Sequence, residues 1–163
     1  MIFVVLGTWE MPFIRPLKEL EQAVLNGVIK ERILIQSGNT AFASPHMELV
    51  PFFGKEEFER TYDQASLIIC QAGVGSIMLG LKKSKKVIAI ARRAIFNEHI
   101  DDHQLEILYV FERLGSILRW NGDGDLGEAL ARANAFVPTT YPFAREKISG
   151  AILDYLSKNV QMR

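Results

Sequence analysis

The feature that most constrains this chain is a regular alternation of short apolar runs with longer stretches of helical periodicity. Several runs are apolar throughout, as expected of strands covered on both faces, and strands that alternate with helices indicate a parallel sheet. We expect an α/β fold with a mostly parallel sheet and helices on both faces. The predicted strands are Ile2–Leu6, Ile33–Gln36, Met47–Val50, Leu67–Gln71, Val87–Ala91 and Ser116–Arg119. The predicted helices are Phe13–Leu25, Lys55–Gln64, Ser76–Lys82, Asp101–Leu114, Leu126–Asn134 and Phe143–Ser157.

The composition indicates one globular domain over residues 1–163, because 48% hydrophobic residues can bury a substantial core. Basic and acidic residues both number 19, so no net basic field exists to hold a nucleic-acid backbone. The opening run has no basic leader, and no segment approaches the roughly 18 to 20 apolar residues of a spanning helix. The single cysteine, Cys70, excludes an internal disulfide. We therefore expect a cytoplasmic protein that does not bind nucleic acid.

The turns that leave the strands are the places to look for a site, because ligands of such sheets bind beyond the carboxyl ends of the strands. Gly7 and Thr8 follow the first strand. The glycine lets the backbone approach a ligand, and the threonine hydroxyl can hydrogen-bond it. An ordinary strand-ending turn explains the same two residues.

A second turn, residues 71–76, joins an apolar strand to an apolar helix. Gly73 and Gly75 keep side chains away from the first free N–H groups of that helix, which favour an anion together with the helix dipole. Ser76 either offers its hydroxyl to a ligand or caps the helix. The place of the two glycines between strand and helix predicts a phosphate site.

A third turn, residues 91–102, is unusually polar and carries Asn97, a candidate for orienting a substrate. His99 and His103 stand four residues apart with carboxylates nearby, which suggests a metal site. No third and fourth ligand with a recognisable spacing follows, so we predict no metal. The alternative is a solvated helix start, in which Asp101 and Asp102 favour the helix dipole.

Taken together, these segments resemble the donor-binding domain of GT-B glycosyltransferases related to MurG. The resemblance rests on a strand followed by Ala-Gly-x-Gly-Ser, a Lys-rich turn, a second apolar strand, then Asn-x-His and His-Gln-x-Glu. It covers roughly residues 1–115 and implies a Rossmann-like domain. The opening residues 2–13 are similar to exopolysaccharide glycosyltransferase subunits of the PssE type. The chain also resembles the soluble subunit of the dolichol-linked N-acetylglucosaminyltransferase.

The resemblance implies a site for a UDP-sugar. Gly7 and Thr8 would surround the diphosphate together with Gly73, Gly75 and Ser76, and the segment around Phe53 would lie beside the uracil. His103 and Gln104 match positions that face the donor sugar or phosphates, so they are the implied catalytic residues. Glu106 follows in the same motif, and Asn97 belongs to the implied donor site.

Two residues depart from the pattern that the resemblance implies. Gln71 stands where many relatives have His, and Leu79 stands where they carry the Glu that holds the ribose hydroxyls. The second change puts nucleoside anchoring and catalytic competence in question, and Glu10 is one candidate to substitute for that Glu. The implied reaction is an inverting transfer with no bound metal or other cofactor, in which a general base activates the acceptor. No base is identified, although His99 or His103 could titrate in the right range.

A complete enzyme of this kind needs two such domains. The implied partner is a membrane-associated, acceptor-binding glycosyltransferase subunit that presents a lipid-linked acceptor, which would place this chain at the membrane periphery. Residues 82–86, rich in Lys, either complete a helix end or contact anionic lipid. The apolar face of the helix within 143–160 either packs into the core or docks on the partner. Two further interpretations remain: a catalytically silent nucleotide-sugar-binding regulatory subunit, and an epimerase-like enzyme.

Overall fold

The computed structural model describes residues 1–139 and confirms the α/β fold. Six parallel strands lie in the order β3-β2-β1-β4-β5-β6. The strands are β1 (Ile2–Val5), β2 (Ile33–Gln36), β3 (Glu48–Val50), β4 (Leu67–Gln71), β5 (Val87–Ile90) and β6 (Leu118–Trp120). The helices are α1 (Ile14–Leu25), α2 (Lys55–Gln64), α3 (Val74–Lys82), α4 (His103–Arg113) and α5 (Leu126–Ala135), with a short 3-10 helix η1 (Ala94–Phe96). The predicted helix Phe143–Ser157 and the docking segment 143–160 lie outside the described residues.

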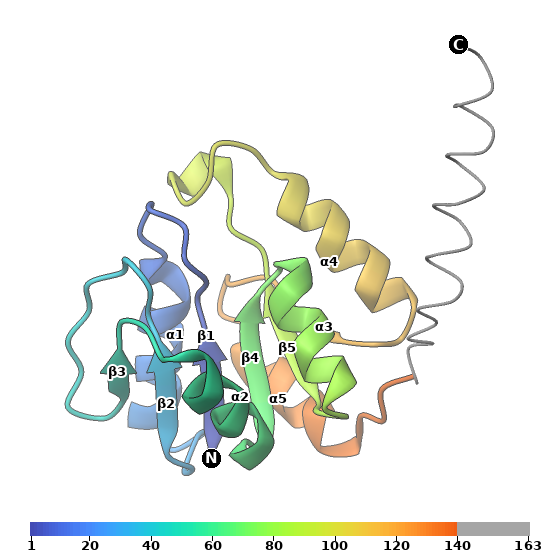
Figure 1. Ribbon diagram of the computed structural model, residues 1–163, viewed down its shortest axis with the longest axis horizontal. Coiled ribbons are helices and arrows are strands. Elements are labelled where there is room, and N and C mark those ends of the chain that lie inside the picture. The colour runs from blue at the N-terminus through green and yellow to red at the C-terminus, as the bar shows by residue number, and fades with distance from the viewer. Residues whose placement is uncertain (140–163) are drawn as a thin grey trace.

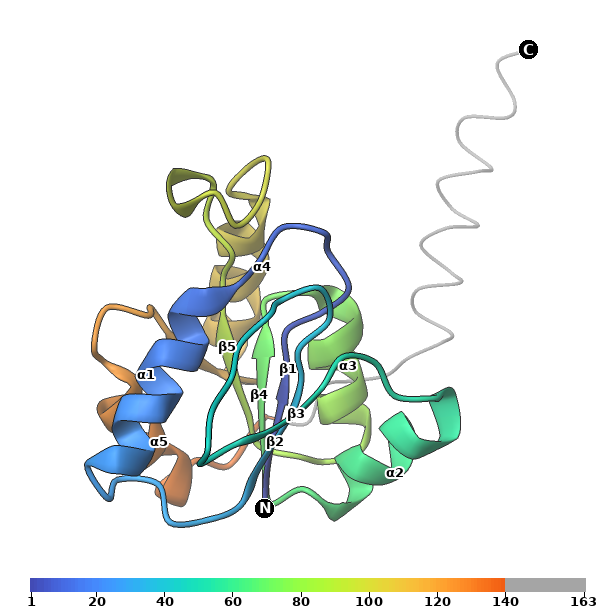
Figure 2. The same ribbon diagram turned by 90° about the vertical axis from the view of Figure 1, so that its left-hand side faces the viewer.

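Helices cover both faces of the sheet, with α1 and α5 on one face and α2, α3 and α4 on the other (Figures 1 and 2). Alternate residues of each strand enter opposite cores, as the pleat requires. In β1, Ile2 and Val4 pack with α1 and α5, whereas Phe3 and Val5 pack with the other three helices. Both cores exclude solvent from β1 and β5, which explains why these two strands are apolar throughout.

The predicted boundaries of the described elements lie within two residues of the observed ones, and three of the differences matter. Helix α3 begins at Val74 rather than Ser76, because Gly73 takes an extended conformation and serves as the N-cap without a side chain. Helix α4 begins at His103 rather than Asp101, so both aspartates precede the helix. Strand β6 starts at Leu118, two residues later than predicted, because Gly115 turns the chain with a φ of +65°.

The chain reverses its direction of winding between β1 and β4, the two central neighbours in the sheet. Connections from β1 run outward to β2 and β3 on one side, and those from β4 run to β5 and β6 on the other. The turns that follow β1 and β4 therefore separate and leave a crevice, where open α/β sheets bind ligands. Among the described residues, no helix is long and apolar enough to cross a membrane.

Candidate functional site

A cavity of about 480 Å³ lies in this crevice and brings together the residues predicted from the two glycine turns. Figure 2 shows the chain leaving β1 and β4 at the same upper end of the sheet. The predicted residues that line the cavity are Gly7, Thr8, Phe53, Gly73, Gly75 and Ser76. Three segments that lie far apart in the sequence thus meet at one site. Their separation along the sequence does not by itself show that they meet.

The amino end of α3 forms one wall of the cavity. The first hydrogen bond at this end of the helix runs from the Ile77 N–H to the Gly73 carbonyl, at 3.2 Å. The N–H groups of Val74, Gly75 and Ser76 come before it and have no partner within the helix. Ser76 lies inside the first turn and no side chain caps the helix, so the capping interpretation of Ser76 is wrong. This end of the helix therefore offers backbone N–H groups and the positive end of a dipole to an anion.

Aromatic side chains also line the cavity, and they were only partly predicted. Phe52 is half exposed and lines the cavity with Phe53 and Phe58. Phe53 and Phe58 both pack edge-on against buried Phe3, with ring centroids 5.8 and 5.7 Å away. The Phe53 N–H also donates to Gln36 Oε1 at 3.2 Å. A flat apolar surface in the same cavity as an anion site suits a planar base joined to a phosphate.

The floor of the cavity is the side chain of Gln71, whose orientation is fixed by Arg92. The Arg92 Nε donates to Gln71 Oε1 at 2.7 Å. Because a guanidinium only donates, the amide oxygen must face it and the amide NH₂ group must point the other way. That group lies against Gly7, where an ideal Cβ would be 2.0 Å from Gln71 Nε2. Gly7 also has a φ of +79°, so both its conformation and its surroundings require glycine.

Arg92 is a buried cation, with a relative exposure of 1%. Its remaining guanidinium N–H groups donate to the carbonyls of Leu6, Met11 and Glu98 at 2.7–3.0 Å, and the ring of Phe13 lies 4.6 Å from its central carbon. Burial lowers the pKa of Arg92 to about 10, which leaves the side chain charged at neutral pH. Arg92 thus fastens the turn after β1 to the turn after β5 and holds Gln71 between them.

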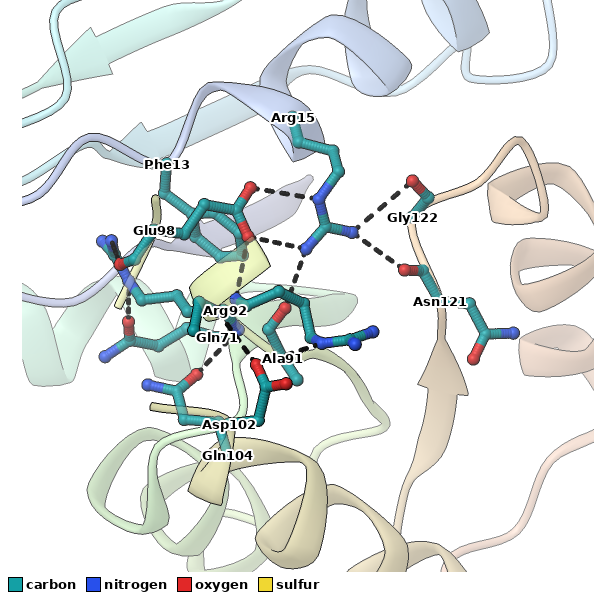
Figure 3. A network of polar contacts seen from close by, with 12 residues as sticks. Phe13, Arg15, Gln71, Ala91, Arg92, Glu98, Asp102, Gln104, Asn121 and Gly122 are labelled. Carbon is teal, nitrogen blue, oxygen red and sulfur yellow. Dashed lines mark hydrogen bonds and ion pairs between the residues drawn. The ribbon is translucent and has the colours of Figure 1, made fainter. Parts of the chain in front are cut away.

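Much of the polar turn after β5 is bonded internally (Figure 3). Arg15 donates twice to the Glu98 carboxylate, at 2.8 and 3.0 Å, and once to the Ala91 carbonyl at 2.8 Å. The Asp102 carboxylate accepts from the Ala94 N–H at 2.8 Å and pairs with Arg93 at 3.2 Å. Many of the polar groups that suggested substrate contacts therefore hold the turn in shape.

The other predicted site residues do not line the crevice cavity. Asn97 lines a separate cavity of about 540 Å³ and has a φ of +54°. Gln104 is buried, and its Oε1 accepts a hydrogen bond from the backbone N–H of Arg92 at 3.0 Å. The His103 ring is bonded to Asp101, while Glu106 is exposed in the first turn of α4. Leu79 packs against the core and does not line the cavity, and neither does exposed Glu10.

Sequence analysis did not assign several of the residues around the cavity. Gln36, Phe52, Lys55, Phe58 and Gln71 all line it. Gln71 was noted only as a departure from a pattern. A polar residue at the end of an otherwise apolar strand was the available signal, because the carboxyl ends of such strands face the ligand crevice.

The Lys-rich residues 82–86 mostly serve local structure. The Lys83 ammonium pairs with Asp63 at 2.7 Å. Lys85 donates to the Asp63 and Ala65 carbonyls, and Lys86 donates to those of Ala133 and Asn134 at the end of α5. These contacts favour the helix-end interpretation. They also occupy the ammonium of Lys86, which lines a cavity of about 440 Å³ at the amino ends of the strands.

Comparison with known proteins identifies the family. Residues 1–117 match the model of the glycosyltransferase family 28 C-terminal domain. This chain belongs to that family. Membership confirms the predicted resemblance to the C-terminal domain of a glycosyltransferase. No curated protein sequence matches the chain significantly.

Solved structures share the fold of this family 28 domain. A glycotransferase of kitacinnamycin superposes with a TM-score of 0.60 at 17% identity, over 91% of this chain and 37% of its own. ALG13 gives 0.55 at 19% identity, over 93% of this chain and 94% of its own. MurG of Acinetobacter baumannii gives 0.54 at 16% identity, over 81% of this chain and 40% of its own. The chain thus spans well under half of two of these proteins and nearly all of the third.

Proposed function

We propose that this chain is the UDP-sugar-binding subunit of a two-component inverting glycosyltransferase in polysaccharide or lipid-linked glycan synthesis. One observation carries the proposal: the crevice cavity joins an open helix end to an aromatic wall. The helix end suits a diphosphate and the aromatic wall suits a uracil. Family membership makes a sugar nucleotide the natural ligand with both parts.

The chemistry of the donor site follows from the groups that surround it. Negative charge grows on the departing UDP during transfer, and backbone N–H groups at the start of α3 would stabilise it. The NH₂ group of Gln71, held by Arg92, would add a neutral donor without requiring a metal. We assign His103 and Gln104 to the donor sugar, Glu106 to the same motif, and Asn97 to the edge of the donor site. No cofactor is needed.

A separate partner supplies the acceptor in this proposal. No described residue that lines the crevice cavity is a histidine, aspartate or glutamate, so the cavity holds a donor without offering a general base. We place that base on a membrane-associated, acceptor-binding glycosyltransferase subunit that presents a lipid-linked acceptor. This chain would then be cytoplasmic and reach the membrane through its partner. The transferred group is expected to be a hexosyl or N-acetylhexosaminyl group.

Two other functions follow from other observations. Leu79 offers no carboxylate to a ribose, which favours a silent, nucleotide-sugar-binding regulatory subunit. An epimerase-like enzyme of related fold is the third candidate, and it would turn over a sugar nucleotide without any acceptor. Product analysis separates the three, because only the glycosyltransferase forms a new glycosidic bond.

Calorimetric titration with UDP tests the donor site, and Gly75→Asp is the decisive variant. A carboxylate on the second residue of α3 repels the diphosphate and blocks N–H groups, each worth about 1.5–3 kcal/mol to an anion. We expect affinity to fall by about 100-fold or more. Gly127→Asp is the matched control, because Gly127 is also the second residue of a helix and an added Cβ meets nothing within 4 Å at either glycine.

Both variants should keep or raise thermal stability, since an aspartate in the first turn of a helix is favourable. Equal binding of UDP and ADP, or unchanged binding by Gly75→Asp, would overturn the donor-site assignment.

Transfer from UDP-sugar to a lipid-linked acceptor, measured for each subunit and for both together, tests the partner. Robust transfer by this chain alone contradicts the two-component proposal.

A further inference from the structure

Three potential metal ligands converge beside the crevice, at the start of α4. The Nδ1 atom of His99 lies 3.0 Å from Oδ1 of Asp101, and the Nδ1 atom of His103 contacts the same oxygen. The three ligand atoms all lie within 4.8 Å of one another. Zinc bonds to nitrogen and oxygen are about 2.0–2.2 Å long, which places tetrahedral ligand atoms a little over 3 Å apart. The cluster is close to that size.

Neighbouring groups hold two of the ligands in place. His99 has a relative exposure of 8%, and its ring stacks on Trp9 with centroids 4.7 Å apart. Asp101 Oδ1 also accepts the backbone N–H of His103 at 3.1 Å, which fixes the carboxylate against the helix start. The side chain of His103 is about half exposed (49%), so one side of the cluster opens to solvent. Water can reach a fourth coordination position from that side.

The cluster contains a carboxylate, that of Asp101, whose negative charge can attract a cation. The His99 Nδ1 atom accepts the Asp101 backbone N–H at 3.3 Å, which requires a lone pair on Nδ1. That lone pair also faces the carboxylate oxygen at 3.0 Å, so a cation between the two atoms would stabilise their approach. The two other carboxylates of the turn are already neutralised, Glu98 by Arg15 and Asp102 by Arg93. Asp101 therefore remains as the carboxylate directed at the two imidazoles.

We propose that His99, Asp101 and His103 form a site for a divalent transition-metal ion of the zinc class, completed by water. Two imidazoles and one carboxylate make a ligand set that zinc favours when it keeps an open position. Binding of the metal does not depend on the function of the crevice. If His103 acts on the donor sugar, as proposed above, binding of the ion keeps the His103 ring away from the sugar and inhibits transfer.

Calorimetric titration of the EDTA-treated chain with zinc chloride tests the site, with cobalt absorption as a second probe of tetrahedral ligation. We expect one ion per chain and weaker binding in acid, because protons compete for the imidazole nitrogens. His99→Ala, Asp101→Asn and His103→Ala should each weaken binding by at least about tenfold. The control is His46→Ala, which removes the third histidine of the chain, an exposed residue of the β2–β3 loop.

Several results would overturn the proposal. Zinc binding that survives Asp101→Asn, or that His46→Ala weakens equally, indicates adventitious surface binding. Absence of binding by the folded wild-type chain indicates a hydrogen-bonded cluster with no metal role. Thermal melts of each variant without metal separate loss of a ligand from loss of the fold. Zinc binding with no UDP binding retains the metal site and rejects the donor site, so the two proposals fail separately.

Discussion

The turns after β4 and β5 leave neighbouring strands at the same edge of the sheet, yet they are built in opposite ways. The turn after β4 uses glycines and leaves backbone N–H groups open to a ligand. The turn after β5 is rich in charged side chains, and two of its carboxylates, Glu98 and Asp102, accept hydrogen bonds from the turn's own backbone N–H groups. A turn rich in polar residues is therefore not, for that reason alone, a ligand site. In the proposed donor site, the plainer turn supplies the N–H groups for UDP, and the charged turn holds Gln71 in place through Arg92.

The largest effect should come from removing the centre of the support, Arg92. Arg92→Met leaves the carbonyls of Leu6, Met11 and Glu98 without their guanidinium donor. Loss of one member of a buried charged network costs about 3–5 kcal/mol of unfolding free energy. Urea denaturation measures that loss. The matched control is Arg93→Met, because Arg93 is about one-third exposed (34%) and its surface pair with Asp102 contributes little to stability.

Equal destabilisation by Arg92→Met and Arg93→Met would contradict the division between support and binding surface. The same two variants also test whether the support reaches the cavity. Arg92→Met should weaken UDP binding because Gln71 loses its fixed orientation, whereas Arg93→Met should not.

A smaller effect is expected at Gln71, where the two turns meet. Gln71→Leu removes the amide NH₂ group beside Gly7 and keeps a similar volume. A hydrogen bond to a charged ligand is worth about 1.5–3 kcal/mol, so the affinity for UDP should fall by about 10-fold to 100-fold. Gln71→Glu should bind still less UDP while pairing with Arg92. Calorimetry and thermal melts together check both variants, and unchanged affinity in Gln71→Leu would remove Gln71 from the site.

Much of the fold and half of the site could be predicted from the sequence, for different reasons. The strands around Ile69 and Ile88 are apolar throughout, and such runs fix both the element type and the burial. Gly73 and Gly75 indicated the anion site because both lie in one turn, where their effect on the start of the helix does not depend on distant residues. Arg92 could not be predicted, because its partners lie up to 86 residues away. Nothing near Arg92 in the sequence shows that its guanidinium is buried rather than exposed.

Asn97 gives a third, still smaller effect, because its backbone and its side chain have separate roles. Its φ of +54° lies in the left-handed region, which costs most residues about 1–2 kcal/mol and glycine little. Asn97→Ala should therefore lower the unfolding free energy by about 1 kcal/mol, whereas Asn97→Gly should not. UDP itself should bind both variants normally, since Asn97 does not line the crevice cavity. If Asn97→Gly lowers affinity for UDP-sugar alone, the side chain contacts the sugar.

The smallest effect concerns Asp102 and the response of the charged turn to acid. The hydrogen bond from the Ala94 N–H, with a contribution from Arg93, holds the pKa of the Asp102 carboxyl below its ordinary value of 3.8. The unfolded chain then binds this proton at a higher pH than the folded chain does. Stability from this group is therefore complete above the unfolded pKa and is lost as pH falls from about 4 toward the lower folded pKa.

Asp102→Asn should accordingly flatten the acid limb of the stability curve below about pH 4, and should change UDP binding at neutral pH little. Thermal melts from pH 3 to pH 7 measure the difference. Asp123→Asn provides the control, because Asp123 is an exposed loop aspartate outside the bonded turn. If both variants respond to acid alike, the Asp102 carboxylate does not stabilise the turn through Ala94, and the contrast between the two turns rests on Arg92 and the Arg15–Glu98 pair.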